Sequence, residues 1–224
     1  MLRKYIRPTA RSMILSSFIL GALSQNAMTT PIPLNSHLWS ETDETFLEKS
    51  SAMISEVEVE APDGWINFCV RNTADCDNSE INNQFIQLTE DSYKNLIKIN
   101  KQVNSRLRPQ SDIAHNNTID YWEIPQDNYG DCEDYALMKR KLLIEAGFSK
   151  GALLMTIAKL DSGELHAILT VRTQYGDYVL DNLSDDISPW FNRPFKYLKR
   201  QSLNNQNIWT ALNVTIARSK IANS

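Results

Sequence analysis

The chain has 224 residues, with 23 Lys and Arg against 27 Asp and Glu and a formal net charge of −4. This acidic balance argues against nucleic acid as a partner, because nucleic-acid-binding surfaces are usually basic. The sequence also lacks a glycine-rich phosphate-binding loop, an internal repeat and a low-complexity tract.

The first 27 residues have the pattern of a secretory signal peptide. Four basic residues and no acid precede the apolar run MILSSFILGAL (13–23), and small and polar residues follow it. This run is too short to span about 30 Å of hydrocarbon comfortably, so cleavage after Ser24 or Ala27 is favoured over an uncleaved membrane anchor. Without residues 1–27, 19 basic residues face 27 acidic ones, a net charge of −8. We therefore expect an exported protein, periplasmic or secreted.

The remaining sequence divides into an arm and one domain. Residues 28–60 are polar, begin with two prolines and show little periodicity. They predict either a poorly ordered N-terminal arm or an edge element of a sheet. Residues 61–224 are numerous enough to bury a sizeable core as a single domain.

Three cysteines remain in a compartment that permits oxidation. Cys69 and Cys76 lie close together in NFCVRNTADCDN, and this proximity predicts a disulfide, with two free thiols as the alternative. Cys132 is then unpaired. An odd cysteine in an exported protein is either an intermolecular link or a reactive thiol.

Two helices are predicted, and a long connection separates them. Residues 89–107 carry apolar side chains along one face, and Thr89 is a suitable N-cap. The second helix is expected at about 132–146 and also has an apolar stripe. Residues 108–130 between them are rich in Asn, Asp and Pro, and loops of this length are often functional.

Three strands are predicted after the second helix, at 152–159, 165–173 and 177–183. Turn signals separate them, and the second turn is expected to be centred on Tyr175–Gly176, so the strands form a meander. A further strand is predicted near the C-terminus, at 208–217. Helices that precede a group of antiparallel strands predict an α+β fold.

Cys132 lies between two acids at the start of the second predicted helix, in YGDCEDY. Free N–H groups at a helix N-terminus lower the pKa of a thiol and can hold a developing oxyanion. The carboxylates of Asp131 and Glu133 have the opposite effect on the thiolate. These acids either stabilise the helix through its N-terminal dipole, by about 0.3–1 kcal/mol each, or have another role.

A base and an orienting acid for Cys132 can be found in the predicted strands. His166 is the only one of the three histidines inside a strand, and Asp181 lies in the next strand. Cys, His and Asp arranged in this way predict a thiol-protease triad. The alternatives are ordinary: His166 as a core residue, Asp181 as a strand-end cap and Cys132 as a small buried side chain.

The predicted hairpin register does not bring this base and acid together. A turn centred on Tyr175–Gly176 sets Asp181 opposite Thr170, four residues from His166. Four residues span about 13 Å of strand, too far for a hydrogen bond. The triad therefore requires an earlier turn or a bulge.

Upstream of the nucleophile, Trp122 and Gln126 are candidates for a side-chain donor to the oxyanion. Trp122 is equally suited to the core.

Several stretches resemble the bacterial transglutaminase-like cysteine proteinases, in their cysteine-pair-bearing branch. The resemblance covers about 62–210 and rests on motifs in the same order. These motifs are WINFCVRNTADC, LIKINKQVNSRLRPQSD, YWEIPQDNYGDCEDY, GDCEDYALMKRKLLIEAG, ELHAILTVRT, GDYVLDN and PWFNRPFKYLKRQS. One departure is Asn128, two residues before the GDCEDY run, where the family often has glycine. Asn tolerates positive φ better than most residues, so we expect little effect.

The resemblance implies a papain-like or transglutaminase-like α+β fold, in which the catalytic helix packs on an antiparallel sheet. It also implies an exported protease with the triad Cys132, His166 and Asp181. Calcium is the implied cofactor, held by Asp131 and Glu133 with help from Asp134. Bound calcium would offset the penalty that these acids impose on a thiolate.

The resemblance further implies a biological role and partners. Characterised members of the family clip the N-terminal region of large surface adhesins and so control attachment and biofilm formation. An inner-membrane receptor that senses cyclic di-GMP inhibits them. Two other functions remain open: acyl transfer by a transglutaminase or amidase with the same triad, and a non-catalytic peptide-binding module.

Overall fold

The structure, a computed structural model, describes residues 52–79, 81 and 84–213. The predicted signal peptide (1–27) and most of the predicted N-terminal arm (28–60) lie outside the described residues. No helix within the described ranges is both long enough and apolar enough to cross a membrane.

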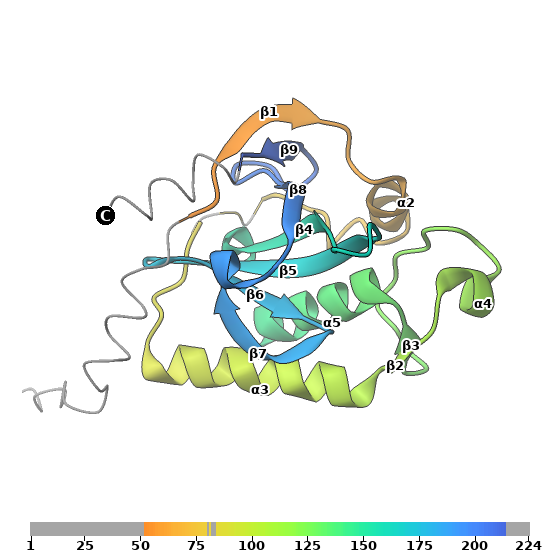
Figure 1. The fold of residues 1–224 in the computed structure, drawn as a ribbon, viewed down its shortest axis with the longest axis horizontal. Helices are drawn as coiled ribbons and strands as arrows, with labels where there is room; N and C mark the ends of the chain where they lie inside the picture. The colour runs from red at the N-terminus through yellow and green to blue at the C-terminus, as the bar shows by residue number, and fades with distance from the viewer. Residues whose placement is uncertain (1–51, 80, 82–83, 214–224) are drawn as a thin grey trace, which may run out of the picture. The chain divides into compact units, whose positions relative to one another are not determined.

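A seven-stranded antiparallel sheet is the largest element of the described residues (Figure 1). The strand order is β1-β9-β8-β4-β5-β6-β7. The strands are β1 (Ser55–Val59), β4 (Leu153–Lys159), β5 (Leu165–Thr173), β6 (Gly176–Asp181), β7 (Ser184–Pro189), β8 (Lys196–Gln201) and β9 (Trp209–Leu212). The predicted meander is therefore present as β4–β5–β6 and continues into β7.

The two edge strands were the least apparent from the sequence. Strand β1 comes from the last part of the predicted arm and pairs with β9, so this segment is an edge element of the sheet. Strand β7 has the sequence SDDISP, which is poor in the β-branched and aromatic residues that favour strands. Pairing with β6 and contact with α3 define this strand, rather than its own composition.

Helices α3 and α5 pack against each other and against the β5–β7 part of the sheet (Figure 1). The helices are α2 (Asp63–Arg71), α3 (Glu90–Arg106), α4 (Asp112–Asn116) and α5 (Cys132–Glu145). Short 3-10 turns occupy Lys150–Ala152 and Trp190–Asn192. The α+β class with a helix packed on an antiparallel sheet is confirmed.

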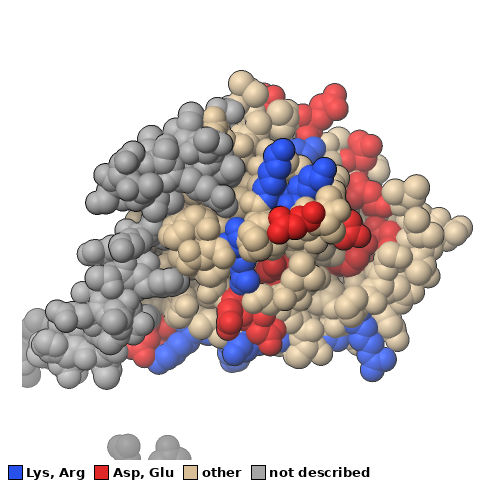
Figure 2. All heavy atoms as spheres, in the orientation of Figure 1, with Lys and Arg blue, Asp and Glu red and all other residues tan. Residues whose placement is uncertain are grey.

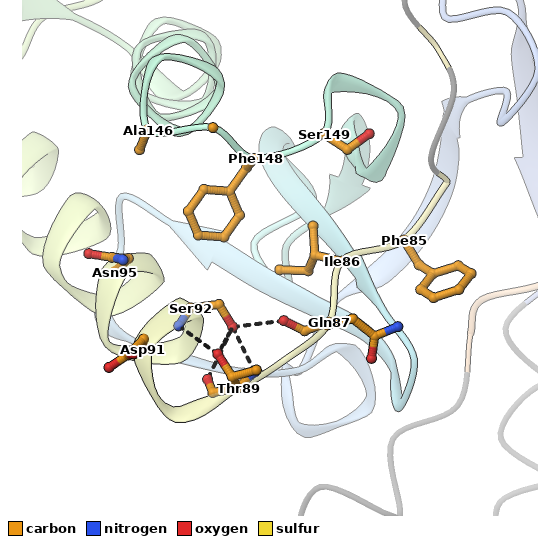
Figure 3. A pocket seen from close by; sticks show the side chains of 11 residues that line it. Phe85, Ile86, Gln87, Thr89, Asp91, Ser92, Asn95, Ala146, Phe148 and Ser149 are labelled. Carbon is orange, nitrogen blue, oxygen red and sulfur yellow. Dashed lines mark hydrogen bonds between the residues drawn. The ribbon is translucent and has the colours of Figure 1, made fainter. Parts of the chain in front are cut away.

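Helix α3 begins and ends where the sequence predicted. Thr89 is its N-cap: the Thr89 hydroxyl accepts a hydrogen bond from the Ser92 N–H (3.2 Å). In return the Ser92 hydroxyl accepts one from the Thr89 N–H (2.8 Å; Figure 3). The helix ends before Leu107, which adopts an extended conformation. Leu96 and Val103 on its predicted apolar face are fully buried.

Helix α5 is buried on more sides than its sequence pattern indicated. Every residue from Glu133 to Arg140 is buried, although the sequence showed only an apolar stripe. A charged side chain can be buried when it has a polar partner. The Arg140 guanidinium donates a hydrogen bond to the Gln206 side-chain oxygen (2.6 Å). Neighbouring elements therefore fix α5 firmly, and with it Cys132 at its N-terminus.

Two apolar clusters lie on opposite faces of the sheet, because successive strand residues alternate between faces. Leu169 belongs to the cluster beneath the helices, whereas Ile168 and Val179 belong to the other cluster. By the same alternation, His166 and Asp181 share the face of Ile168 and Val179.

A small loop next to α2 is closed by a disulfide. Cys69 and Cys76 are bonded to each other, as predicted, and Cys76 is buried. Cys132 is the free cysteine of the described residues. The thiol chemistry of this part of the chain is therefore restricted to Cys132.

Candidate active site

Cys132 is the first residue of α5, and the local sequence explains why the helix begins there. Asp131 is the N-cap, and its carboxylate accepts a hydrogen bond from the backbone N–H of Asp134. The Asp134 carboxylate in turn accepts one from the Asp131 N–H (3.2 Å). This reciprocal capping box fixes the first turn of the helix, and the backbone N–H of Cys132 has no partner within the helix.

Two residues before the helix are restricted, one by its backbone conformation and the other by a close contact. Asn128 has φ 70°, which explains how asparagine replaces the glycine common at this position in the resembled family. Gly130 lies so close to Asp134 that an added Cβ would be 2.7 Å from the Asp134 Cβ. Both residues therefore help to guide the chain into the capping box.

The sulfur of Cys132 lies between a carboxylate and strand β5. Its thiol donates to the Glu133 carboxylate (Sγ to Oε2, 3.1 Å), and its sulfur accepts from the Ala167 N–H (3.3 Å). Burial, followed by the charge of Glu133, raises the pKa of the thiol well above its usual value. Among the described residues, Cys132 makes no hydrogen bond to the His166 ring. The thiol proton is thus directed to Glu133.

His166 precedes the residue that contacts the sulfur, and its imidazole is bound to Asp181 (Nε2 to Oδ1, 2.8 Å). Both side chains are almost fully buried. Because an ionised carboxylate can only accept, Nε2 carries the proton and Nδ1 is left as the basic nitrogen. The ring of Phe195 packs edge-on against His166, with 5.7 Å between ring centroids, which restricts rotation of the imidazole.

The environment of Asp181 favours its charged form. Burial raises the pKa of its carboxyl, but the hydrogen bond and charge of His166, the Leu183 N–H and the charge of Lys139 together lower it below the usual value. The Leu183 N–H donates to the same oxygen as His166 (3.0 Å). Asp181 can therefore orient the imidazole and balance a positive charge on it.

The hairpin register predicted from the sequence was wrong by two residues. Thr173 pairs with Gly176, so the turn is Gln174–Tyr175, one residue earlier than predicted. Continued in the same register, Asp181 would lie opposite Ile168 and not opposite Thr170. A diagonal offset of two residues is within reach of long side chains, which explains the contact with His166.

A cluster of carboxylates surrounds the start of α5. One oxygen each from Asp112, Asp131 and Asp134 lie within 4.8 Å of one another, and the same holds for Asp131 and Glu133 with the Cys132 sulfur. One carboxylate oxygen of Asp112 and one of Asp131 are buried without a hydrogen-bond partner. Asp112 was not identified from the sequence as part of this cluster. Its only signal was its place in the long Asn- and Asp-rich connection.

Crowding and burial make these acids hard to ionise. Burial raises the pKa of Glu133 to about 9, with a further contribution from the charge of Asp131. Burial likewise raises the pKa of Asp134 to about 8, and the pKa values of Asp112 and Asp131 are raised for the same first reason. Several oxygen ligands with excess negative charge are what a hard cation such as Ca²⁺ binds, so the residues fit a calcium ion.

We expect the calcium-free protein to lose stability as the pH rises from about 5 to about 7. The pKa values of Glu133 and Asp134 in the folded protein, about 9 and about 8, lie above their ordinary values near 4. Unfolding therefore releases protons over this range, and the free energy of unfolding falls with rising pH. Lys139, whose pKa burial lowers to about 7, opposes this trend only at higher pH.

Melting temperatures in chelator at several pH values measure this effect. The double variant Glu133→Gln with Asp134→Asn should show a flatter dependence, and saturating calcium should flatten it as well. A wild-type melting temperature in chelator that is constant or rises over this range would contradict the expectation.

Neither predicted side-chain donor to an oxyanion is brought to the thiol. The indole N–H of Trp122 donates to Asp120 (2.7 Å), and its ring packs against Trp65 and Trp209. The Gln126 amide donates to the Ile124 carbonyl (3.0 Å). Trp122 is thus a core residue, and the donor in contact with the sulfur is the Ala167 N–H of β5.

A pocket of about 520 Å³ contains both Cys132 and His166. Its walls include Ile113, Ile119 and Leu165, which are 63%, 79% and 67% exposed. Exposed aliphatic side chains around a cleft are typical of a binding site for another molecule. In Figure 2, acidic side chains gather in a band between the sheet and helices α2 and α4, with basic side chains beside them.

A second pocket, of about 580 Å³, lies at the opposite end of α5 (Figure 3). The N-terminal turns of α3, including Asn95, and the segment around Phe148 form its walls. Its lining residues include neither cysteine nor histidine. The free thiol of Cys132 and the imidazole of His166 therefore make the pocket at Cys132 the candidate active site.

Comparison with known proteins agrees with this chemistry. The family model for bacterial transglutaminase-like cysteine proteinases (BTLCP) matches residues 55–216. Three solved structures of Legionella pneumophila LapG align with 52% of the chain at 27% identity and a TM-score of 0.45. One of them is described as calcium-bound and another as EGTA-treated. The alignment covers 67% of the first two LapG chains and 65% of the EGTA-treated one.

No curated protein matches the chain. The family model nevertheless spans most of the sequence and nearly all of the described sheet. The chain therefore belongs to the family of bacterial transglutaminase-like cysteine proteinases and is a cysteine peptidase.

Proposed function

We propose that the protein cleaves peptide bonds with Cys132 as nucleophile, His166 as base and Asp181 as the acid that orients His166. The observation that carries this proposal is the contact of the Cys132 sulfur with the Ala167 N–H (3.3 Å). This contact sets the sulfur one residue from His166, whose imidazole is bound to Asp181 (2.8 Å). An unpaired thiol and a base in one pocket, with a buried acid that orients the base, are the parts that covalent acyl transfer requires.

In the first step, His166 takes the thiol proton and the Cys132 sulfur attacks the scissile carbonyl carbon. The C–S bond forms, the peptide C–N bond breaks, and His166 gives the proton to the leaving amine. In the second step, His166 takes a proton from water, whose oxygen attacks the thioester, and the C–S bond breaks. The carboxylic acid product leaves, and the proton returns to the thiol. We propose the Cys132 N–H, at the start of α5, as a donor to the oxyanion formed in both steps.

We also propose that Asp131, Glu133 and Asp134 hold calcium, together with Asp112. The support is the carboxylate cluster, with its two unpartnered buried oxygens. A calcium ion bound there would supply positive charge beside the thiol and hold the junction between loop and helix. If Glu133 served as a ligand, its carboxylate would no longer accept the thiol proton, which His166 could then take. The alternative is that these acids only favour the helix N-terminus.

A protease acts on a protein, and the proposed substrate is the N-terminal region of a large surface adhesin. Cleavage there would control attachment and biofilm formation. The basis is the resemblance of the sequence to adhesin-cleaving members of the family. We propose a periplasmic or secreted location from the signal-peptide pattern of residues 1–27. From the same resemblance, we propose inhibition by an inner-membrane receptor that senses cyclic di-GMP.

Mass analysis of a candidate adhesin fragment incubated with the protein and calcium tests the function. Proteolysis gives two fragments whose masses sum to that of the substrate plus one water. A transglutaminase would instead give cross-linked species, and an amidase would convert an amide side chain to a carboxylate without chain cleavage. Cross-linking or deamidation without chain cleavage would overturn the proteolytic assignment and leave the triad in place.

A further inference from the structure

The pairing of β6 with β5 does not set the position of Asp181 next to His166. The regular pairing of these two strands ends at the pair Leu180–Leu169, one residue before Asp181. On its other side, Asp181 pairs with Ser184 of β7, but this pairing is irregular between Val179 and Asp181. The turn that follows Asp181 must therefore be held by other contacts if the carboxylate is to meet the imidazole reliably.

Two asparagines of α3 supply those contacts. The Asn104 amide nitrogen lies 3.0 Å from the Asp181 carbonyl oxygen, 3.1 Å from that of Ser184 and 3.0 Å from a carboxylate oxygen of Asp185. One helical turn earlier, the buried Asn100 donates to the carbonyl oxygens of Ser184 (2.9 Å) and Asp185 (3.0 Å). Figure 1 shows the β6–β7 turn adjacent to α3, which contacts both strands.

We propose that Asn104 is a positioning residue for Asp181, an inference that rests on the proposed Cys132–His166–Asp181 chemistry. Asn104 fixes the backbone of the turn so that the Asp181 carboxylate reaches His166. Asn104 itself does not line the pocket at Cys132.

The variant Asn104→Ala should lower kcat for peptide cleavage by about 10- to 100-fold, since small misplacements of catalytic groups have effects of this size. KM should stay unchanged. Asn104→Asp, which has the same size but cannot donate a hydrogen bond, should lower kcat by a similar factor. Asn95→Ala is the matched control: Asn95 is exposed on the same helix, at the second pocket (Figure 3), and its replacement should leave both constants unchanged.

A double-mutant cycle separates positioning from general damage to the fold. In an Asp181→Asn background, the effect of Asn104→Ala should shrink to less than about twofold, because residues that act through one another are not additive. An undiminished effect in that background would overturn the role of Asn104.

Proton NMR tests the inference even if the chain cleaves no peptide. The buried proton between His166 Nε2 and Asp181 should give a resolved downfield signal in wild type. This signal should weaken or be lost in Asn104→Ala and Asn104→Asp and persist in Asn95→Ala. An unchanged signal in both Asn104 variants would refute positioning by Asn104. If the NMR pattern is as expected but the wild-type protein cleaves no peptide, only the proposed function is refuted.

Discussion

Replacing Cys132 with alanine is expected to abolish peptide cleavage, with a loss of roughly 10⁴-fold or more. The variant retains the pocket but lacks the atom that forms the bond to the substrate. His166→Ala should cost about as much, because His166 is the only histidine among the described residues that line the pocket. A labelled thiol-directed probe and a fluorogenic peptide measure nucleophile and turnover separately. Turnover in Cys132→Ala close to that of wild type would end the assignment of the nucleophile.

Asp181→Asn should be less severe and leave about 10- to 100-fold more activity than Cys132→Ala. Asparagine can still contact His166, but it cannot balance a positive imidazolium. Asp161→Asn, an exposed acid in the turn between β4 and β5, is the matched control and should be fully active. Full activity in Asp181→Asn would require another orienting acid.

Removal of calcium is expected to inactivate the enzyme reversibly and to lower its melting temperature. An ion that binds only the folded state stabilises it by about 3 kcal/mol at a concentration 100-fold above Kd, which corresponds to a shift of several degrees. Calcium should restore activity, whereas magnesium should restore it poorly, because magnesium prefers a rigid six-oxygen shell and retains its waters. The measurement is activity and melting temperature against free calcium.

Substitutions of the acids test whether the effect of calcium on activity and stability comes from the carboxylate cluster at the start of α5. Asp131→Ala and Glu133→Ala should be inactive and insensitive to chelator. Loss of a helix cap alone would reduce stability by only about 0.5–1 kcal/mol and leave turnover unchanged. Glu145→Ala, an exposed acid at the far end of α5, should respond to calcium like wild type. If the wild-type protein is fully active in excess chelator and both acid variants are active, the calcium role is refuted. Asp131 and Glu133 then only stabilise the start of the helix.

The parts of the fold that could be predicted are those with strong local signals. Thr89 and the apolar period after it define α3, and turn residues between β4 and β5 separate two largely apolar strands. Local signals were also sufficient to place Cys132 at a helix start and His166 inside a strand. These features depend on neighbours in sequence, so a single chain reveals them.

The parts that could not be predicted depend on contacts between distant residues. The hairpin register depends on whether Thr173 pairs with Gly176. When the turn shifts by one residue, the β5 residue that lies opposite Asp181 changes by two positions. Asp112 joins the carboxylate cluster only because the long connection folds back onto α5. No periodicity in the sequence carries either piece of information.

That long connection is anchored side by side at its two ends. Strand β2 (Arg108–Pro109) pairs in parallel with β3 (Tyr129–Gly130), so the chain leaves and returns at the same place. The entropy cost of closing such a loop grows only slowly with its length. Insertions or deletions near 116–119, which end at the exposed Ile119, should therefore be tolerated without displacement of the nucleophile. One wall of the pocket is thus free to diversify, and preference for different substrates can evolve while the chemistry is retained.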